Sequence, residues 1–510
     1  MRTPRPARLP VLVSAIVVTV SLASPVAFAA PAGAERSALA GPAPRERPED
    51  FNGDGYRDLA VSAPGTPIAG RQDSGSVAVL YGSRSGALQG RRQILHQDVA
   101  GIRGTVEAND MFGGALTTAD LDRDGYTDLV IGTPYENIGT AGKAGFLKDA
   151  GSLTVVWGGP RGLNGSTVLD GVVAYGELGR HLTAGDVDGD GDQDIVTSSA
   201  AGRDIAVFEG PIRHNGATAG ITAFPHPEHT RNLDLASGDV NGDGMTDIVV
   251  ARKHYDLGDR RDHRYVMFWP GGPAGLATPT ELTDAEGLPL EADHVAVGRI
   301  DGDRYADVVA GRSTHHVNRP DEPAAARGGM ITYLPGSAAG PVPARSRVLN
   351  QDSPGIPGTA GESDLFGSGL SIGDTDRDGY GDISVGVPNK RSKGAESEGG
   401  RVVVVRGGAY GPSGTGAKAF SQNTPGVPGT GEKSDLFGRT TRLADTDGDG
   451  RAELFIGNDQ EHVGKDRYAG ALWRLPSTAS GTTARGAHMI TPRDLGMPTP
   501  WSMFAMAFQD

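Results

Sequence analysis

The sequence predicts an all-β protein, a seven-bladed β-propeller of four-stranded antiparallel blades. Three observations predict this fold. An acidic nine-residue loop recurs seven times, beginning at residues 50, 120, 186, 239, 299, 374 and 445. An apolar segment rich in Val, Leu and Ile follows each loop directly and is typical of a strand. Finally, residues 504–510 repeat the pattern of residues 112–120. Supersecondary units repeated at such a period favour a propeller, which protects its strand edges by closing into a ring.

Each repeat contains four candidate strands. A short apolar segment such as Phe112–Leu116 precedes the loop, and Leu129–Ile131 follows it in the same repeat. A third strand, beginning at Gly151 in that repeat, ends in a Gly- or Pro-rich turn, and a fourth strand follows. The first repeat has no strand before its loop, so we expect residues 504–510 to supply it. No segment shows a 3.6-residue period over ten residues or more, which excludes a helical solenoid.

Six of the seven loops carry an oxygen-bearing side chain at positions 1, 3, 5 and 9 and a glycine at position 6. Such a loop suits Ca²⁺, which takes six to eight oxygen ligands in flexible geometry. Position 7 varies freely, as expected if it supplies its backbone carbonyl. We therefore predict six Ca²⁺ sites. Their predicted ligands are Asp50, Asn52, Asp54, Tyr56 and Asp58; Asp120, Asp122, Asp124, Tyr126 and Asp128; Asp186, Asp188, Asp190, Asp192 and Asp194; Asp239, Asn241, Asp243, Met245 and Asp247; Asp374, Asp376, Asp378, Tyr380 and Asp382; and Asp445, Asp447, Asp449, Arg451 and Glu453.

The fifth loop is the exception. Arg299 stands at its first ligand position and Arg304 replaces its turn glycine, so we expect this loop to bind no metal. EF-hands are excluded because position 12 is never a carboxylate, as Val61 and Ile131 illustrate, and because strands rather than helices flank the loops. The alternative is that the loops are solvated hairpin turns without metal.

The N-terminus predicts secretion. Residues 1–29 combine three arginines, an apolar run over Val11–Ala23 and a small-residue cleavage site at Ala27–Ala29, which is the pattern of a signal peptide. Residues 30–47 are rich in Pro, Ala and Arg and are expected to form a disordered linker, so that the propeller spans residues 48–510. No other segment is apolar enough to span a membrane. The chain has no cysteine, so we expect bound calcium to stabilise this extracellular monomer in place of disulfides.

The repeats resemble a known family. Each typical repeat runs in a fixed order: a Phe-Gly pair, an apolar strand, the loop with Asp at alternate positions, a second strand and Gly-Xaa-Pro, as in Gly132–Pro134 and Gly386–Pro388. This order looks like the FG-GAP repeat of integrin α-subunit propellers. The resemblance extends to connectors that begin at Gln97, Gln351 and Gln422 and run on to the next Phe-Gly. It implies calcium loops on one face and partner-binding loops on the other. Blades three to five depart from it, because they lack the Phe-Gly pair.

The resemblance favours a module that binds an extracellular protein or glycan, as in cell adhesion. Its expected face contains long loops of blades four and five that are rich in basic and histidine residues. The formal net charge of −15 and the lack of a basic stripe argue against a nucleic-acid partner. The predicted ligand-binding residues are Arg252, Lys253, His254, Tyr255, Arg260, Arg261, His263, Arg264, Arg312, His315, His316 and Arg319.

Two alternative functions remain open. One is a secreted hydrolase or lyase with its site at the channel mouth, although the only nucleophile-elbow pattern surrounds Ser371 in a predicted strand. We predict no catalytic residue. The other is a lectin with one sugar site per blade, which the unequal loop lengths disfavour.

Overall fold

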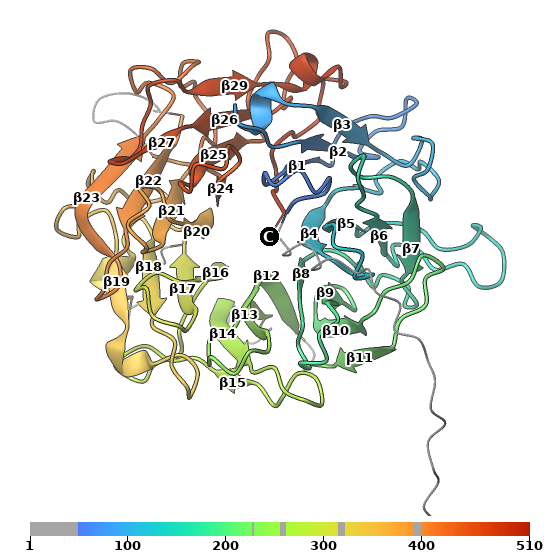
Figure 1. Cartoon of the computed structure of the whole chain (residues 1–510), viewed down its shortest axis with the longest axis horizontal. Coiled ribbons are helices and arrows are strands. Elements are labelled where there is room, and N and C mark those ends of the chain that lie inside the picture. The colour runs from blue at the N-terminus through green and yellow to red at the C-terminus, as the bar shows by residue number, and fades with distance from the viewer. Residues whose placement is uncertain (1–48, 227–228, 256–261, 315–321, 391–398, 510) are drawn as a thin grey trace, which may run out of the picture. The chain divides into compact units, whose positions relative to one another are not determined.

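A computed structural model describes residues 49–226, 229–255, 262–314, 322–390 and 399–509. Seven four-stranded antiparallel blades form a β-propeller, as Figure 1 shows, which confirms the predicted fold class. Helical structure in these ranges amounts to four 3₁₀ turns, η1 (Ala87–Gln89), η2 (Ala324–Ala326), η3 (Pro343–Arg345) and η4 (Pro492–Leu495). None of the helices in the described ranges has the length and apolar character that a membrane span requires.

The blades follow one another along the chain, and their strands pair in sequence order within each sheet. Blade one contains β1 (Leu59–Ala63), β2 (Ser76–Leu80) and β3 (Arg92–Leu95); blade two β4 (Ala115–Ala119), β5 (Asp128–Thr133), β6 (Ser152–Val156) and β7 (Ser166–Asp170); blade three β8 (Leu182–Gly185), β9 (Asp194–Ser199), β10 (Asp204–Glu209) and β11 (Gly220–Phe224); and blade four β12 (Thr230–Gly238), β13 (Asp247–Tyr255), β14 (Asp262–Trp269) and β15 (Thr280–Glu281). Blade five contains β16 (His294–Gly298), β17 (Asp307–Arg312), β18 (Met330–Leu334) and β19 (Arg347–Leu349); blade six β20 (Leu370–Gly373), β21 (Asp382–Val387), β22 (Arg401–Arg406) and β23 (Ser413–Phe420); and blade seven β24 (Thr440–Ala444), β25 (Glu453–Asn458), β26 (Ala471–Leu475) and β29 (His488–Ile490), with a hairpin of β27 (Ser477–Thr478) and β28 (Gly481–Thr482).

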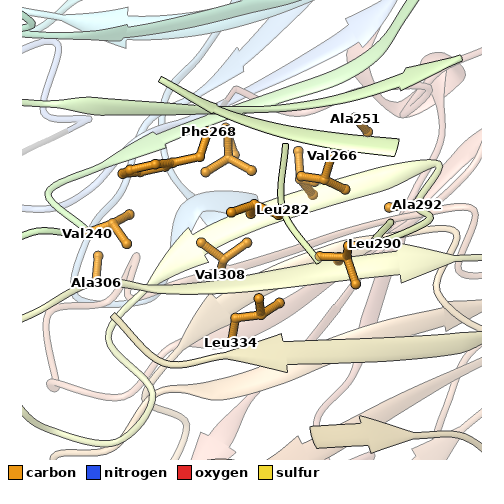
Figure 2. Packing of buried hydrophobic residues seen from close by; sticks show 14 residues of the cluster. Val240, Ala251, Val266, Phe268, Leu282, Leu290, Ala292, Ala306, Val308 and Leu334 are labelled. Atoms are coloured by element: carbon orange, nitrogen blue, oxygen red, sulfur yellow. The ribbon is translucent and has the colours of Figure 1, made fainter. Parts of the chain in front are cut away.

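The second strand of each blade is buried on both faces because the neighbouring blades cover it. Every residue of β5, β17, β21 and β25 is buried, which explains why these strands read as continuous apolar runs. Figure 2 shows the core between blades four and five, where Phe268 of β14 lies above Val308 of β17 and Leu334 of β18. Burial of each such side chain stabilises the fold by about 1.5–3 kcal/mol.

The Phe-Gly pairs join one blade to the next. Phe112 forms a parallel bridge with Gly75, which lies just before β2 of the preceding blade. Gly75 has a φ of +92°, and a Cβ at this position would lie 2.2 Å from the carbonyl oxygen of Phe112. Only glycine permits this backbone approach. Phe366 and Phe437 repeat the bridge with Gly329 and Gly400.

The C-terminal segment closes the ring, as predicted. Phe504 bridges Gly470 in the same way as the Phe-Gly phenylalanines, and Phe508 forms an antiparallel bridge with Val61 of β1. Ser62 N donates to Ala507 O at 3.0 Å, and Ala505 N donates to Ser62 O at 2.8 Å. Residues from the end of the chain therefore complete the four-stranded sheet of blade one.

Candidate metal centre

The acidic loops lie between the first and second strands of the blades and share one hydrogen-bond pattern. In blade two, Asp124 N and Gly125 N donate to the two carboxylate oxygens of Asp120 at 3.1 and 3.0 Å. Tyr126 N donates to Asp124 Oδ1 at 3.0 Å, and Asp124 N also donates to Asp122 Oδ1 at 3.1 Å. These bonds curl the loop around its own carboxylates. The same bonds to position 1 recur from Asp54 N and Gly55 N in blade one.

The carboxylate at position 9 is buried beneath the loop. Asp128 is 1 % exposed and accepts hydrogen bonds from Leu121 N at 2.9 Å and Gly158 N at 2.8 Å. Burial raises the pKa of Asp128 to about 8, and the charges of Asp122 and Asp120 raise it further against those two bonds. A buried carboxylate beside two others is unfavourable without a positive charge. The loop is therefore chemically suited to a cation.

Four loops bring three acidic side chains together so that their ligand atoms lie within 4.8 Å of one another. Oxygens that share a Ca²⁺ at 2.3–2.6 Å can be separated by about this distance. Loops one and four carry Asn52 and Asn241 at position 3, whose Oδ1 accepts a hydrogen bond from the position-5 backbone at 2.8 Å. Several acidic clusters could thus hold a metal ion. The four groups are Asp120, Asp122 and Asp128; Asp186, Asp188 and Asp194; Asp374, Asp376 and Asp378; and Asp445, Asp447 and Glu453.

The fifth loop keeps its fold without a position-1 carboxylate. Ile300 N donates to Asp307 Oδ2 at 2.8 Å, as in the other loops. The hydroxyl of Tyr333, from β18, donates to Asp301 at 3.2 Å and to Asp307 at 3.3 Å. A phenol therefore contacts the two remaining buried acids, and the residues present do not fit a calcium ion.

In blades six and seven an arginine from the third strand contacts the acidic loop, which the sequence analysis missed. Arg406, at the end of β22, pairs with Asp376 and lies 2.6 Å from Asp382 and 3.3 Å from Asp378. Arg474 of β26 lies 3.0 Å from Glu453 and 3.1 Å from Asp447. The sequence signal was an arginine at or near the end of a mainly apolar third strand. These two loops have a full set of calcium ligands, but a guanidinium already neutralises them.

Neighbouring loops also contact each other through position 7. The ring of Tyr126 lies against position 4 of the preceding loop, where a Cβ on Gly53 would be 2.6 Å from it. Arg123 occupies position 4 in blade two, and its Nε lies 2.7 Å from Asp192 at position 7 of blade three. The position-7 side chains therefore connect neighbouring loops. The free variation of this position in the sequence did not indicate such a role. The other contacts of this kind are Met245 with Gly189, Tyr305 with Gly242, Tyr380 with Gly302 and Tyr56 with Gly448.

Comparisons with known proteins agree with this geometry. The model of the FG-GAP repeat matches residues 48–80, 112–156, 366–405 and 437–473, and that of the FG-GAP-like repeat matches residues 186–250. The chain carries FG-GAP repeats. The four FG-GAP matches begin at or near the Phe-Gly pair or the acidic loop and extend into the third strand of the blade.

Relatives of this FG-GAP propeller include enzymes and integrins. It is 32% identical over 199 residues to phosphatidylinositol-glycan-specific phospholipase D of Rattus norvegicus, a match that covers 38% of this chain and 22% of the relative. It is 38% identical over 93 residues to integrin alpha-PS3 of Drosophila melanogaster, covering 18% and 8%, and 29% identical over 168 residues to integrin alpha-7 of Mus musculus, covering 32% and 13%. The matched region thus spans less than a quarter of each relative.

The FG-GAP propeller buries two arginines that we had placed on the ligand-binding face. Arg252 is fully buried, donates to the carbonyl of Arg203 and lies 5.9 Å from the ring centroid of Trp269. Burial lowers its pKa to about 10. Arg312 is 2 % exposed and lies 3.0 Å from Glu291 and 2.6 Å from Glu322. Both arginines are inside the fold, where Arg252 donates to a backbone carbonyl and Arg312 pairs with two glutamates, so neither belongs to an exposed patch.

Five more predicted residues of that face lie on the described parts of β13 and β14. His254 pairs with His263 in the strand register, and Lys253 Nζ lies 4.6 Å from the ring centroid of Tyr255. Arg264 joins blades four and five, because it lies 2.5 Å from Asp293 and donates to Thr314 at 2.7 Å. The other five predicted residues, Arg260, Arg261, His315, His316 and Arg319, lie outside the described residues.

Ser371 has a structural role in the FG-GAP propeller. It lies in β20, is 5 % exposed, and its hydroxyl accepts a hydrogen bond from Leu443 N of blade seven at 2.9 Å. A nucleophile elbow needs a strand, a sharp turn and a helix, and here the strand instead enters an acidic loop. The hydroxyl connects two blades.

Proposed function

We propose that this FG-GAP propeller is a secreted, calcium-binding module that binds an extracellular protein or glycan, as in cell adhesion. The observation that carries the proposal is the repeated loop, in which backbone amides hold buried carboxylates around one point, within repeats of the integrin type. Fold likeness alone does not fix function, so the binding activity is inferred from the integrin relatives by analogy.

Calcium would be held by the side chains at positions 1, 3, 5 and 9 and by the backbone carbonyl at position 7. Loops one to four present these groups without a competing arginine from the third strand among the described residues, although His214 Nε2 lies 2.7 Å from Asp122 in loop two. Loops six and seven require Arg406 or Arg474 to withdraw before an ion can bind. We therefore expect four ions to bind readily and up to six in all. Extracellular calcium modules bind at about 10⁻⁴–10⁻³ M.

The proposal includes the chain organisation expected from sequence. Residues 1–29 would direct export and be removed, residues 30–47 would form a linker, and residues 48–510 would form the propeller. Residues 1–48 lie outside the described part of the chain. Mass spectrometry of protein recovered from a culture medium would show cleavage after Ala29. Protein retained in the cell with its N-terminus intact would contradict secretion.

Binding is tested by capture of residues 30–510 on a panel of glycans, wall polymers and secreted proteins, in calcium and in EDTA. We expect saturable capture in calcium that is weakened when Arg260 and Arg261 become alanine. The matched control is Arg345→Ala with Arg347→Ala, which removes two exposed arginines from the outer edge of blade five. Equal loss in both double variants would indicate nonspecific charge binding, and capture that survives both would place the site elsewhere.

The alternative is a hydrolase or lyase at the channel mouth. The similarity to the rat phospholipase D, which is named as an enzyme, favours this alternative, although the match spans 22% of that protein. Turnover of a phosphodiester, ester or polysaccharide substrate by the purified chain, without stoichiometric capture, would favour the enzyme over the binding module.

A further inference from the structure

Three connectors between blades carry a glutamine whose side chain is buried against a second cluster of charged groups. These clusters lie where the second-to-third-strand loops begin, away from the acidic loops. Gln97, Asp110 and Glu136 form the cluster between blades one and two. The corresponding residues are Gln351, Asp364 and Lys390 between blades five and six, and Gln422, Asp435 and Glu461 between blades six and seven.

The three clusters share one backbone hydrogen bond to the aspartate, and they differ in which carboxylate the glutamine contacts. The aspartate accepts from the backbone N of the residue three positions earlier, at 2.8 Å for Asp110, 2.8 Å for Asp364 and 2.7 Å for Asp435. The glutamine Nε2 donates to Glu136 at 2.6 Å, to Asp364 at 2.9 Å and to Glu461 at 2.9 Å.

One of the three clusters has a cation of its own. Lys390 Nζ lies 2.7 Å from Asp364 Oδ2 and donates to the carbonyl of Thr359 at 2.5 Å. The ammonium group is buried, with Lys390 7 % exposed, so it neutralises Asp364 inside the protein. At the same position the other two clusters have glutamate, which replaces an ion pair by two carboxylates.

The cluster between blades one and two contains oxygen atoms without a partner. Gln97 is 8 % exposed, and its Oε1, like that of Gln351 and Gln422 in the other two clusters, accepts no hydrogen bond within the described part of the chain. The same is true of Oδ1 of Asp110, which is fully buried. Burial raises the pKa of Glu136 to about 8, and the charge of Asp110 raises it further. Buried oxygens left without donors are unfavourable unless a ligand satisfies them.

We propose that Asp110, Glu136 and Gln97 bind a divalent cation of the calcium type, and that Asp435, Glu461 and Gln422 bind a second one. The charge count favours a divalent ion, because Asp364 and Lys390 sum to zero whereas Asp110 and Glu136 sum to −2 when both are ionised. The donors are all oxygens, which suits a hard cation. Thr105 corresponds to Thr359 in the connector, so we include its carbonyl in the proposed ligand set. Each ion would fasten a connector to the loop that follows the second strand.

The test counts Ca²⁺ bound per chain by equilibrium dialysis in the parent and in charge-swapped variants. Glu136→Lys copies the cluster that contains Lys390, so it should fold, lose one ion per chain and melt at a higher temperature than the parent in EDTA. Lys390→Glu copies the other two clusters and should gain one ion. Glu286→Lys makes the same charge change at an exposed site and should leave the count unchanged.

Parental ion counts in both Glu136→Lys and Lys390→Glu, with circular dichroism showing folded protein, would overturn the proposal. If Glu136→Lys does not fold, Lys390→Glu decides alone, and the absence of an additional ion overturns it. These variants leave every ligand of the acidic loops in place. Failure of the loops to bind calcium would therefore be visible separately, as a low count in the parent.

Discussion

Replacement of Phe504 by alanine tests the closure of the ring. The ring of Phe504 is fully buried in the core shared by blades one and seven, with Leu472, Phe455 and Val61. Loss of such a side chain costs about 3–5 kcal/mol. With an unfolding entropy of about 2.1 cal/mol/K per residue, the roughly 460 residues of the propeller convert this cost into a fall in Tm of about 3–5 °C.

The assay is calorimetry in calcium, with two comparison variants. Phe112→Ala removes the corresponding phenylalanine of blade two and should lower Tm by a similar amount, because both rings are fully buried and both residues make the same backbone bridge to a glycine. Trp501→Ala changes a half-exposed aromatic residue in the same segment and should have a much smaller effect. If Phe504→Ala has the same Tm as the parent while Phe112→Ala has a lower Tm, residues 504–509 do not hold the ring closed.

Three further perturbations follow from the buried charges. Arg406→Leu should destabilise the protein in EDTA by about 3–5 kcal/mol, because it leaves buried carboxylates unpaired. Added Ca²⁺ should restore the Tm of this variant. A Tm that stays low in Ca²⁺ would show that this loop cannot hold an ion. Arg312→Met should lower stability by a similar amount through the loss of the pairs with Glu291 and Glu322. The amount of partner captured per folded molecule should stay at the parental level. Reduced capture by fully folded protein would show that Arg312 belongs to the binding face. Burial lowers the pKa of His181 from 6.5 to about 4, so the folded protein keeps this histidine neutral while the unfolded chain takes up a proton below pH 6.5. Tm should therefore fall as the pH falls from 6.5 towards 4, and the His181→Asn variant should lack the part of the fall that His181 causes. Identical pH profiles of parent and variant would refute this assignment.

The sequence was sufficient for the architecture because the repeats encode it locally. A position-9 acid followed at once by a buried strand, as in Asp128–Thr133, marks both the loop and the blade. The role of Phe504–Gln509 was also predictable, because this segment repeats the residues around Phe112. Both predictions depended on residues that are close together in the chain or identical in pattern.

The side chains that enter the loops from elsewhere were not predictable. Arg406 lies 24 residues after Asp382, and its contact depends on the register of β21 with β22. Tyr333 reaches Asp301 in the same way across β17 and β18. Arg312 was misplaced for a related reason: its partners Glu291 and Glu322 come from two different connecting segments, so the sequence showed a charge without showing that it is buried.

The pairing of residues near both ends in one blade determines how the propeller would bear mechanical load. The C-terminal segment runs antiparallel to β1, and Gln509 Nε2 donates to the carbonyl of Asp58 at 3.0 Å. A force that separates residues 58 and 509 therefore pulls on adjacent points at the same end of two paired strands. Such a force opens the hydrogen bonds one after another, beginning at Asp58 and Ala60, instead of shearing them together. Tension applied along the chain would thus open blade one at low force and leave the other six blades folded, whereas tension applied through the loops would bypass this weak point.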